Sequence, residues 1–328
     1  MIDCLSNPSW INPQIDFLLF LQNIRIEHSV IFDKFFLSIT VFGELWLPTL
    51  VCAIVYWCID FKSGLYLFSL ECFNSIITHF LKMIACVYRP WVLSDKIHPS
   101  ELAVPFAKGY SFPSGHSSMS SAVLGGLAYL IRQKKIFCIS LICLVLLIGF
   151  SRLWLGVHTP QDVVCGLLVG FSSIFIVDKI IKWAEKNKNR YLILALIANI
   201  ITAAMIIYMQ YFNNYRMDYI DGKLLVDPQK SIYSTVLIYG YILGLLNGYL
   251  LCAKFFPFNP QKTTVKNRVI IGITGSLLII FISRNIIEHF IMNSASITAV
   301  FPIMFIIGLF ITLIYPLIFQ YFDKNIKE

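Results

Sequence analysis

The chain has 328 residues, of which 58% are hydrophobic and only 13% are charged, and its mean hydropathy is +0.74. A soluble domain is about 45–50% apolar, so this composition excludes an ordinary soluble protein and predicts an integral membrane protein. The net charge of +8 does not indicate a nucleic-acid partner, because the basic residues lie in short loops between apolar runs, as is typical of membrane proteins.

An amphipathic segment near residues 14–31 comes first, and it is predicted as a helix in the membrane interface because Asp16, Arg25 and Glu27 interrupt its apolar residues. Five apolar stretches follow, each close to the roughly 20 residues that cross a bilayer. They cover approximately residues 35–59, 64–87, 115–132, 136–155 and 160–183. After the basic run 182–190, four further stretches lie near residues 191–212, 232–253, 269–291 and 298–320. The sequence therefore predicts an all-α, polytopic transmembrane helical bundle of about nine spans.

This pattern divides the chain into three expected regions. They are an N-terminal interfacial segment at residues 1–34, a core of five spans at residues 35–190, and a C-terminal membrane extension of four spans at residues 191–328. The largest loop of the extension is the polar segment Asn213–Lys230.

Lysine and arginine are concentrated in alternate loops. The richer set contains Lys62, Arg132, Lys134, Lys135, Lys179, Lys182, Lys186, Lys188, Arg190, Lys254, Lys262, Lys266, Arg268, Lys324 and Lys327. Apart from the motifs described below, the opposite loops hold Lys96, Lys108, Arg216, Lys223 and Lys230, and the N-terminal segment adds Arg25 and Lys34. The richer set is therefore predicted to be cytoplasmic, with the N-terminus outside and the C-terminus inside.

The first of three polar clusters lies at the end of the second apolar stretch. Lys82 and Arg89 are seven residues apart there, which is two helical turns, so both are expected on one face of the helix, with Pro90 ending it. Charges at such depth are costly, which indicates a functional role in binding an anion. The alternative is that both side chains extend toward lipid head groups.

The second cluster, Pro113-Ser114-Gly115-His116, opens the third apolar stretch. Free backbone N–H groups at a helix start form an anion site, and glycine lets the backbone approach a ligand closely. His116 is the first side chain on that helix, where it could give a proton to a leaving oxygen. A simple helix cap is the alternative interpretation.

The third cluster runs from Ser151 to Asp162 and crosses into the fifth stretch. Thr159 is predicted as the N-cap of that helix, which places Asp162 in its first turn. The Asp162 carboxylate can then reach back to His158 and fix its tautomer, leaving the other ring nitrogen free as a nucleophile. Arg152, at the end of the fourth stretch, is expected to point to the same place.

The three motifs Lys-x6-Arg-Pro, Pro-Ser-Gly-His and Ser-Arg-x5-His-x3-Asp, in this order, resemble the type 2 phosphatidic acid phosphatase superfamily of membrane phosphatases. The resemblance covers residues 82–162 and extends to the five-span core. It implies that His158 attacks phosphorus and becomes phosphohistidine, that Asp162 orients His158, and that His116 is the general acid. It also implies a set of groups that hold the phosphoryl oxygens, namely Lys82, Arg89, Ser114, Gly115 and Arg152.

The expected function is that of an integral-membrane phosphatase, a phosphoric monoester hydrolase that acts on a lipid phosphate or prenyl diphosphate at the extracytoplasmic face of a bacterial plasma membrane. Its expected partners are the phosphorylated lipid substrate and membrane lipids. No cofactor is expected and no metal, because Asp162 serves His158 and no other carboxylate cluster suggests metal ligands. The individual substrate and the oligomeric state are left open by the sequence.

Two alternatives stay open at this point. One is a sugar phosphatase resembling glucose-6-phosphatase, whose layout of nine spans with an outside N-terminus is similar. The other is a catalytically silent lipid-binding or transport protein, against which the intact residues His116, His158 and Asp162 argue.

Several polar residues lie outside the motifs. Arg284, Glu288 and His289, in the eighth stretch, are expected either to pair with one another or to line a substrate pocket. Glu44, Glu71 and His79 are expected as buried, hydrogen-bonded structural groups.

Overall fold

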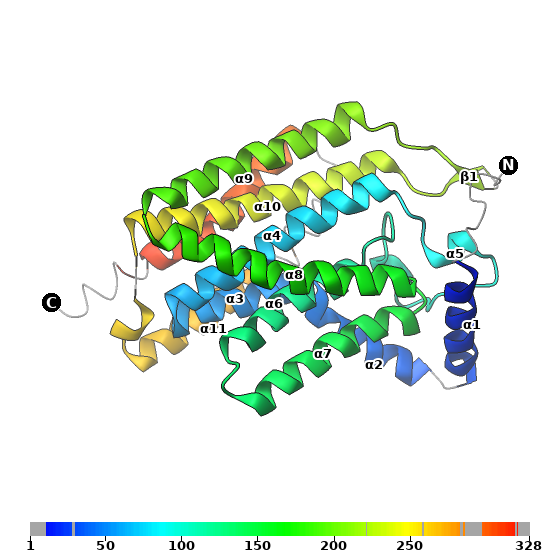
Figure 1. Ribbon diagram of the computed structural model, residues 1–328, viewed down its shortest axis with the longest axis horizontal. Helices are drawn as coiled ribbons and strands as arrows, with labels where there is room; N and C mark the ends of the chain where they lie inside the picture. Colours follow the sequence, from blue (N-terminus) through cyan, green and yellow to red (C-terminus); the bar gives the residue numbers. More distant parts are fainter. Residues whose placement is uncertain are drawn as a thin grey trace. The chain divides into compact units, whose positions relative to one another are not determined.

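The computed structural model of the chain describes residues 11–27, 30–220, 222–257, 259–282, 285, 297–318 and 320. Helices make up almost all of this described part (Figure 1). In the N-terminal half they are α1 (Asn12–Glu27), α2 (Val30–Thr40), α3 (Trp46–Ile54), α4 (Phe61–Ala85), α5 (Pro90–Leu93), α6 (Gly115–Leu130), α7 (Lys135–Trp154) and α8 (Pro160–Glu185). In the C-terminal half they are α9 (Asn189–Ile207), α10 (Pro228–Phe255), α11 (Val265–Phe281) and α13 (Ile297–Leu309).

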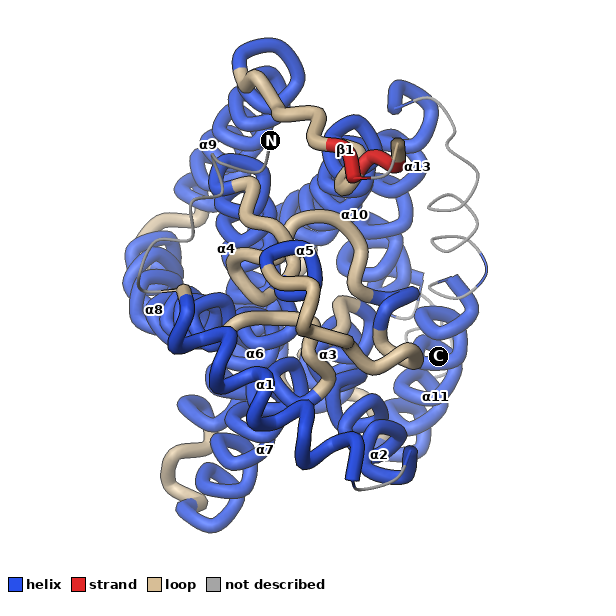
Figure 2. The backbone as a smooth tube through the Cα atoms, turned by 90° about the vertical axis from the view of Figure 1, so that its right-hand side faces the viewer, coloured by secondary structure: helices blue, strands red, loops and turns tan. Residues whose placement is uncertain are grey.

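Shorter elements extend or connect these helices. Three of them are short 3₁₀ helices, namely η2 (Val41–Gly43), η4 (Val104–Phe106) and η6 (Pro260–Lys262). Three others are π-helical, namely η3 (Val55–Ile59), η5 (Tyr208–Phe212) and η8 (Phe310–Ile314). The strands β1 (Tyr219–Ile220) and β2 (Lys223–Leu224) form a small antiparallel pair in which Tyr219 is opposite Leu224 (Figure 2). Over the described residues the fold is therefore all-α apart from this hairpin.

The predicted helical bundle is confirmed, because each predicted apolar stretch is mainly helical where it is described. Six of the described helices are long and apolar enough to cross a membrane, and the broken pair of helices that includes α2 and α3 adds a seventh if it is one span. The break in the predicted first stretch falls at residues 44–45, after η2. Gly43 packs there against the start of α6, because a Cβ on Gly43 would lie 2.8 Å from the carbonyl oxygen of His116. The count of nine spans remains a prediction.

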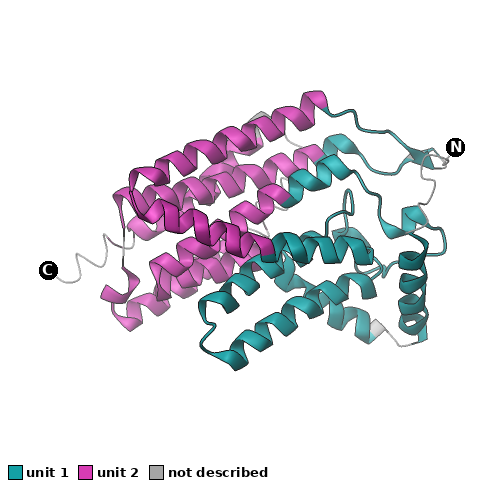
Figure 3. Cartoon of the chain, viewed as in Figure 1, with its two compact units in different colours: residues 1–44, 78–171, 213–231 teal, residues 45–77, 172–212, 232–328 magenta. Residues whose placement is uncertain are grey.

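Contacts group the chain into two compact units, each built from separate segments (Figure 3). Unit 1 consists of residues 1–44, 78–171 and 213–231, and unit 2 consists of residues 45–77, 172–212 and 232–328. The first unit thus contains all three sequence motifs, together with the polar loop of the extension. The expected division at residues 34 and 190 remains a prediction.

Small residues allow close helix packing within unit 2. A Cβ on Gly240 in α10 would lie 2.8 Å from the carbonyl oxygen of Phe301 in α13, and a Cβ on Gly244 would meet the backbone of Phe305. These glycines are four residues apart, so they form the small-xxx-small face on which membrane helices approach each other. α10 and α13 therefore pack closely against each other.

The polar residues expected as structural groups divide into two kinds. Glu71 is fully buried in unit 2 and accepts a hydrogen bond from the Thr49 hydroxyl, as expected. Glu44 and His79 are half-buried rather than buried. Arg284, Glu288 and His289 lie outside the described residues.

Candidate active site

All eight predicted site residues lie in unit 1, at helix ends and in the loops beside them. Lys82 is in the last turn of α4, Arg89 directly precedes α5, Ser114 caps α6, Gly115 and His116 begin α6, Arg152 is in the last turn of α7, His158 lies between α7 and α8, and Asp162 is in the first turn of α8. Helix ends suit this task, because their backbone groups are free to bind ligands and to hold charged side chains.

The Asp162 carboxylate is fixed by three groups. Its Oδ2 atom accepts hydrogen bonds from the backbone N–H of Thr159 at 2.9 Å and from the Ser111 hydroxyl at 2.6 Å, and it lies 3.3 Å from Nδ1 of His158. The Thr159 hydroxyl accepts in turn from the N–H of Asp162 at 3.3 Å, so Thr159 caps α8 as predicted. The cap of α8 therefore holds the carboxylate beside the imidazole.

Arg89 is held in place mainly by backbone carbonyls. Its guanidinium donates to the carbonyl oxygens of Gly109 at 3.2 Å, Lys108 at 3.0 Å and Val157 at 2.9 Å. A further N–H, on Nη1, lies 2.9 Å from Nε2 of His158. Four of the five N–H groups of the guanidinium are used in this way, which fixes its plane against the histidine.

These contacts determine the tautomer of His158. Because a guanidinium only donates hydrogen bonds, Nε2 must accept and carries no proton. The ring proton is therefore on Nδ1, which faces Oδ2 of Asp162 and lies 3.2 Å from the Ser111 hydroxyl oxygen. The tautomer agrees with the prediction, but Nε2 is not free, since it accepts a hydrogen bond from Arg89.

The expected helical relationship between Lys82 and Arg89 is wrong. α4 ends at Ala85, and Cys86 adopts a left-handed backbone conformation with φ of 49°, which stops the helix four residues before Pro90. Pro90 does not end a helix but begins α5, where a proline at the first position costs no hydrogen bond. Arg89 thus enters the site from an extended segment instead of from the face of α4.

Lys82 holds the loop that leads into the second motif. Its ammonium donates to the carbonyl oxygens of Tyr110 at 2.9 Å, Ser111 at 3.1 Å and Pro113 at 3.2 Å. An ammonium has three N–H donors, so these carbonyls use all of them. In this arrangement Lys82 positions Ser111 beside Asp162.

Arg152 keeps an unused donor inside the protein. The side chain is 2% exposed, and Nη1 donates to the Thr40 hydroxyl at 2.9 Å. Its Nε atom is buried and has no hydrogen-bond partner among the described residues. A buried donor without a partner is costly, so an anion that accepted from it would stabilise this arrangement.

The second motif forms the start of α6 as predicted. The Ser114 hydroxyl oxygen accepts from the N–H of Ser117 at 3.4 Å and from the Ser117 hydroxyl at 2.9 Å, which is a helix cap. A Cβ on Gly115 would meet no atom of the described chain within 4 Å, so the backbone at this helix start faces open space. His116 is half-buried and is close enough to Arg152, Arg89 and Lys82 for their charges to act on it.

The environment of His158 favours the neutral imidazole. Burial lowers the pKa of His158 well below its usual value, and the positive charges of Arg89, Arg152 and Lys82 lower it further. Only a neutral imidazole with an unprotonated Nε2 can act as a nucleophile. Burial and neighbouring charge therefore keep the His158 imidazole neutral near neutral pH.

Two contributors to the site were not predicted. Ser111 binds both Asp162 and His158, although no spacing rule connects it to either residue. Asp218, in the polar loop of the extension, accepts a hydrogen bond from the Tyr88 hydroxyl at 2.7 Å. That bond connects the polar loop to the backbone next to Arg89. In the sequence, the aspartates of the loop were the only sign that it could take part in such a contact.

The fold and site together define a helical membrane protein with a histidine–aspartate pair among buried cations. Residues 63–186, which contain all eight predicted site residues, match the family model of the PAP2 superfamily. Residues 236–326 match the model of the PAP2 superfamily phosphatase transmembrane extension. The chain is an integral membrane protein and belongs to the PAP2 superfamily.

Three phosphatases are among the proteins to which this chain is similar. The chain is 28% identical over 117 residues to phosphatidylglycerophosphatase B of Bacillus subtilis, an overlap that covers 32% of this chain and 57% of that protein. It is 34% identical over 101 residues to undecaprenyl-diphosphatase BcrC of the same organism, covering 31% and 49%. It is 31% identical over 112 residues to lipid A 1-phosphatase of Rhizobium etli, covering 33% and 45%. The chain thus spans about half the length of these relatives, and no solved structure is significantly similar to it.

Proposed function

We propose that the protein is a membrane phosphatase that removes phosphate from a lipid phosphate or a prenyl diphosphate through a phosphohistidine intermediate on His158. The observation that carries this proposal is the contact of 2.9 Å between Nε2 of His158 and Nη1 of Arg89, with Nδ1 held by Asp162. A nucleophilic nitrogen and a cationic donor meet there at one point, which is what an incoming phosphoryl group requires. The names of the relatives agree with a phosphorylated lipid as the substrate class.

The proposed phosphate site combines several donors. The Arg89 N–H that now binds Nε2 turns to a phosphoryl oxygen when the substrate enters, and Nε of Arg152 supplies a second charged donor. The open space beside Gly115 leaves room for an oxygen at the start of α6. Phosphoryl transfer depends mainly on positioning and on stabilising the charge of the equatorial oxygens, so such a set of donors supports it.

The reaction proceeds in two steps. Nε2 of His158 attacks phosphorus, the bond from phosphorus to the leaving oxygen breaks, and His116 gives that oxygen a proton. The phosphohistidine keeps its charge balance because the Nδ1 proton faces the Asp162 carboxylate. His116, now neutral, takes a proton from water, whose oxygen attacks phosphorus and breaks the bond to Nε2. Inorganic phosphate leaves and both histidines return to their initial states.

The proposal includes the side of the membrane and independence from a metal ion. The excess of lysine and arginine in the loops predicted as cytoplasmic supports a site on the extracytoplasmic face. The donors that neutralise the phosphoryl charge in this mechanism are side chains of Arg89 and Arg152, and no step requires a metal ion. The bacterial plasma membrane is the proposed location.

A substrate panel tests the proposal. Purified protein is assayed in excess EDTA for phosphate release from phosphatidic acid, phosphatidylglycerol phosphate, undecaprenyl diphosphate and glucose 6-phosphate, with His158→Ala as the inactive control. We expect release from at least one lipid substrate and little from glucose 6-phosphate. Preference for glucose 6-phosphate would favour the sugar phosphatase, and no release from any substrate would favour a silent binding protein.

A further inference from the structure

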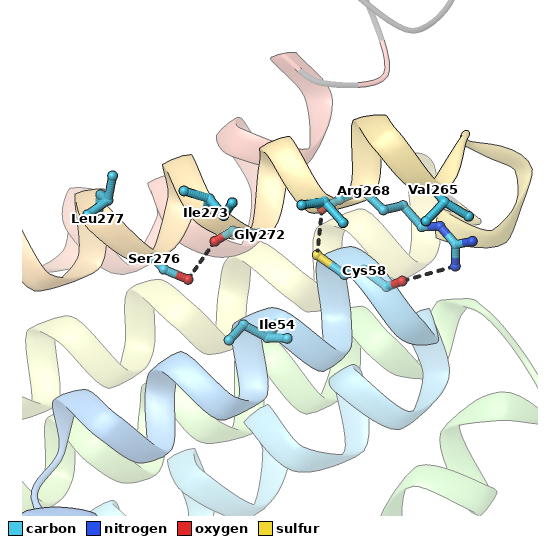
Figure 4. A pocket seen from close by; sticks show the side chains of 9 residues that line it. Ile54, Cys58, Val265, Arg268, Gly272, Ile273, Ser276 and Leu277 are labelled. Atoms are coloured by element: carbon cyan, nitrogen blue, oxygen red, sulfur yellow. Dashed lines mark hydrogen bonds between the residues drawn. The ribbon is translucent and has the colours of Figure 1, made fainter.

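A groove runs along one face of α11 in unit 2, and it has a volume of about 540 Å³. It is lined by Ile54, Cys58, Val265, Arg268, Val269, Gly272, Ile273, Ser276 and Leu277. The α11 residues recur every three or four positions, so they form one helical face, and Ile54 and Cys58 face them from α3 and η3 (Figure 4). None of these residues belongs to the candidate active site.

The walls of the groove offer almost no polar partner to a ligand. The Ser276 hydroxyl donates to the carbonyl oxygen of Gly272 at 2.5 Å, and the Cys58 thiol donates to that of Arg268 at 3.2 Å (Figure 4). Gly272 adds no side chain, and a Cβ there would lie 3.1 Å from Sγ of Cys58. Apart from Arg268, the remaining lining residues are aliphatic. This part of the groove therefore suits a hydrocarbon chain.

Arg268, in the first turn of α11, is the cation in this lining. Nη1 of Arg268 donates to the carbonyl oxygen of Cys58 at 3.3 Å, while its buried Nε has no hydrogen-bond partner within the described part of the chain. None of the salt bridges found among the described residues includes Arg268. Lys262 and Lys266 are exposed, and both lie close to Arg268 in the sequence. The groove thus joins an apolar trough to a guanidinium that has spare donors.

We propose that this groove binds an anionic phospholipid as a ligand, with one acyl chain along α11 and the phosphate at Arg268. The lining from Arg268 to Leu277 extends over about 14 Å of helix, which is similar to the roughly 15 Å of hydrocarbon in one leaflet. Charge complementarity selects the head group, because a guanidinium binds a phosphate oxygen pair well. The end of α11 that carries Arg268 is predicted to be cytoplasmic, where anionic head groups bind basic sites between membrane helices. This inference does not depend on the proposed phosphatase function.

Native mass spectrometry of the purified full-length protein tests the site. The protein is titrated in detergent with phosphatidylglycerol or phosphatidylcholine of identical acyl chains. Both lipids are phosphodiesters without the terminal phosphate that the proposed phosphatase would remove. We expect phosphatidylglycerol to bind about tenfold more tightly, and Arg268→Gln to reduce that preference to near parity. Lys254→Gln, which removes a charge from the end of α10 outside the groove, is expected to leave the preference unchanged.

A second variant tests the acyl-chain part of the groove. Ser276→Phe fills the trough without changing charge, and we expect it to weaken binding of both lipids several-fold while the protein stays monodisperse. Equal binding of the two lipids by the wild type would overturn the proposal, because any bilayer lipid would then fill the groove. An equal loss of preference in Lys254→Gln and Arg268→Gln would also overturn it, since diffuse charge would then explain the selectivity.

Discussion

Nη1 of Arg89 lies 2.9 Å from Nε2 of His158, so the proposed nucleophile and a residue proposed to bind phosphate form a hydrogen bond with each other in the structure. This contact does two things. It requires the Nδ1-protonated tautomer of His158, and it marks the point at which a phosphoryl group would enter. In the proposed mechanism, substrate binding exchanges one hydrogen bond of Arg89 for another, so the cation would be in position before the reaction begins.

Arg89→Lys tests this arrangement. A lysine keeps the charge but loses the planar fork that binds three backbone carbonyls and His158 together. We expect kcat/KM on a lipid phosphate to fall by about 10²–10³-fold. Arg132→Lys makes the same change at a site where the guanidinium lies over Tyr129, and it should leave the rate unchanged. Equal rates in wild type and Arg89→Lys would show that the fork is not needed.

Ser111→Ala tests the positioning of Asp162. The substitution removes the 2.6 Å hydrogen bond to Oδ2 and the contact with Nδ1 of His158, while the Thr159 N–H still holds the carboxylate. We expect kcat to fall about ten- to hundredfold with little change in KM, the scale of one hydrogen bond to a charged group. Ser120→Ala, whose hydroxyl donates only to its own helix, is the control. A loss confined to KM would instead assign Ser111 to substrate binding.

The three motifs and the helices that carry them were predictable from the sequence. The course of the chain between the helices, and the contacts that the loops make with the site, were only partly predictable. Hydropathy and cap residues predict where α6, α7 and α8 begin and end, because burial and capping act locally. The end of α4 at Ala85 was not predicted, since it depends on a left-handed conformation at Cys86 that no cysteine signals. Ser111 was missed because contacts between residues distant in sequence, among them those of Lys82 and Arg89 with carbonyls of its loop, bring Ser111 to Asp162.

The lowered pKa of His158 predicts how stability depends on pH. The unfolded state binds the proton near the ordinary value of about 6.5, whereas the folded state binds it only at lower pH. Between these two values the unfolded state holds more protons, so the free energy of unfolding decreases as pH falls. We expect the wild-type Tm in detergent to drop from pH 7.5 to pH 5.5, and to drop less in His158→Gln. Identical drops would mean that His158 has a similar pKa in both states.

His116→Ala tests the general-acid role through the leaving group. Loss of the acid leaves the departing alkoxide of a lipid without a proton, and general acid catalysis is worth about 10²–10⁴-fold. We expect a loss on that scale with phosphatidic acid and a much smaller loss with p-nitrophenyl phosphate, whose leaving group is a stable anion. Asp162→Asn is the comparison, because it should slow both substrates by similar factors. A uniform loss in His116→Ala would assign His116 to phosphate binding or structure.

The covalent intermediate tests the central proposal most directly. Purified protein is mixed with phosphatidic acid labelled with ³²P in its phosphate, quenched in alkali within milliseconds to seconds, and analysed for protein-bound label. Phosphohistidine is stable in alkali and labile in acid, so the wild type should carry alkali-stable label that acid releases. His158→Ala should carry none, while His116→Ala should still become labelled with p-nitrophenyl [³²P]phosphate. Acid-labile label that persists in His158→Ala would contradict the account.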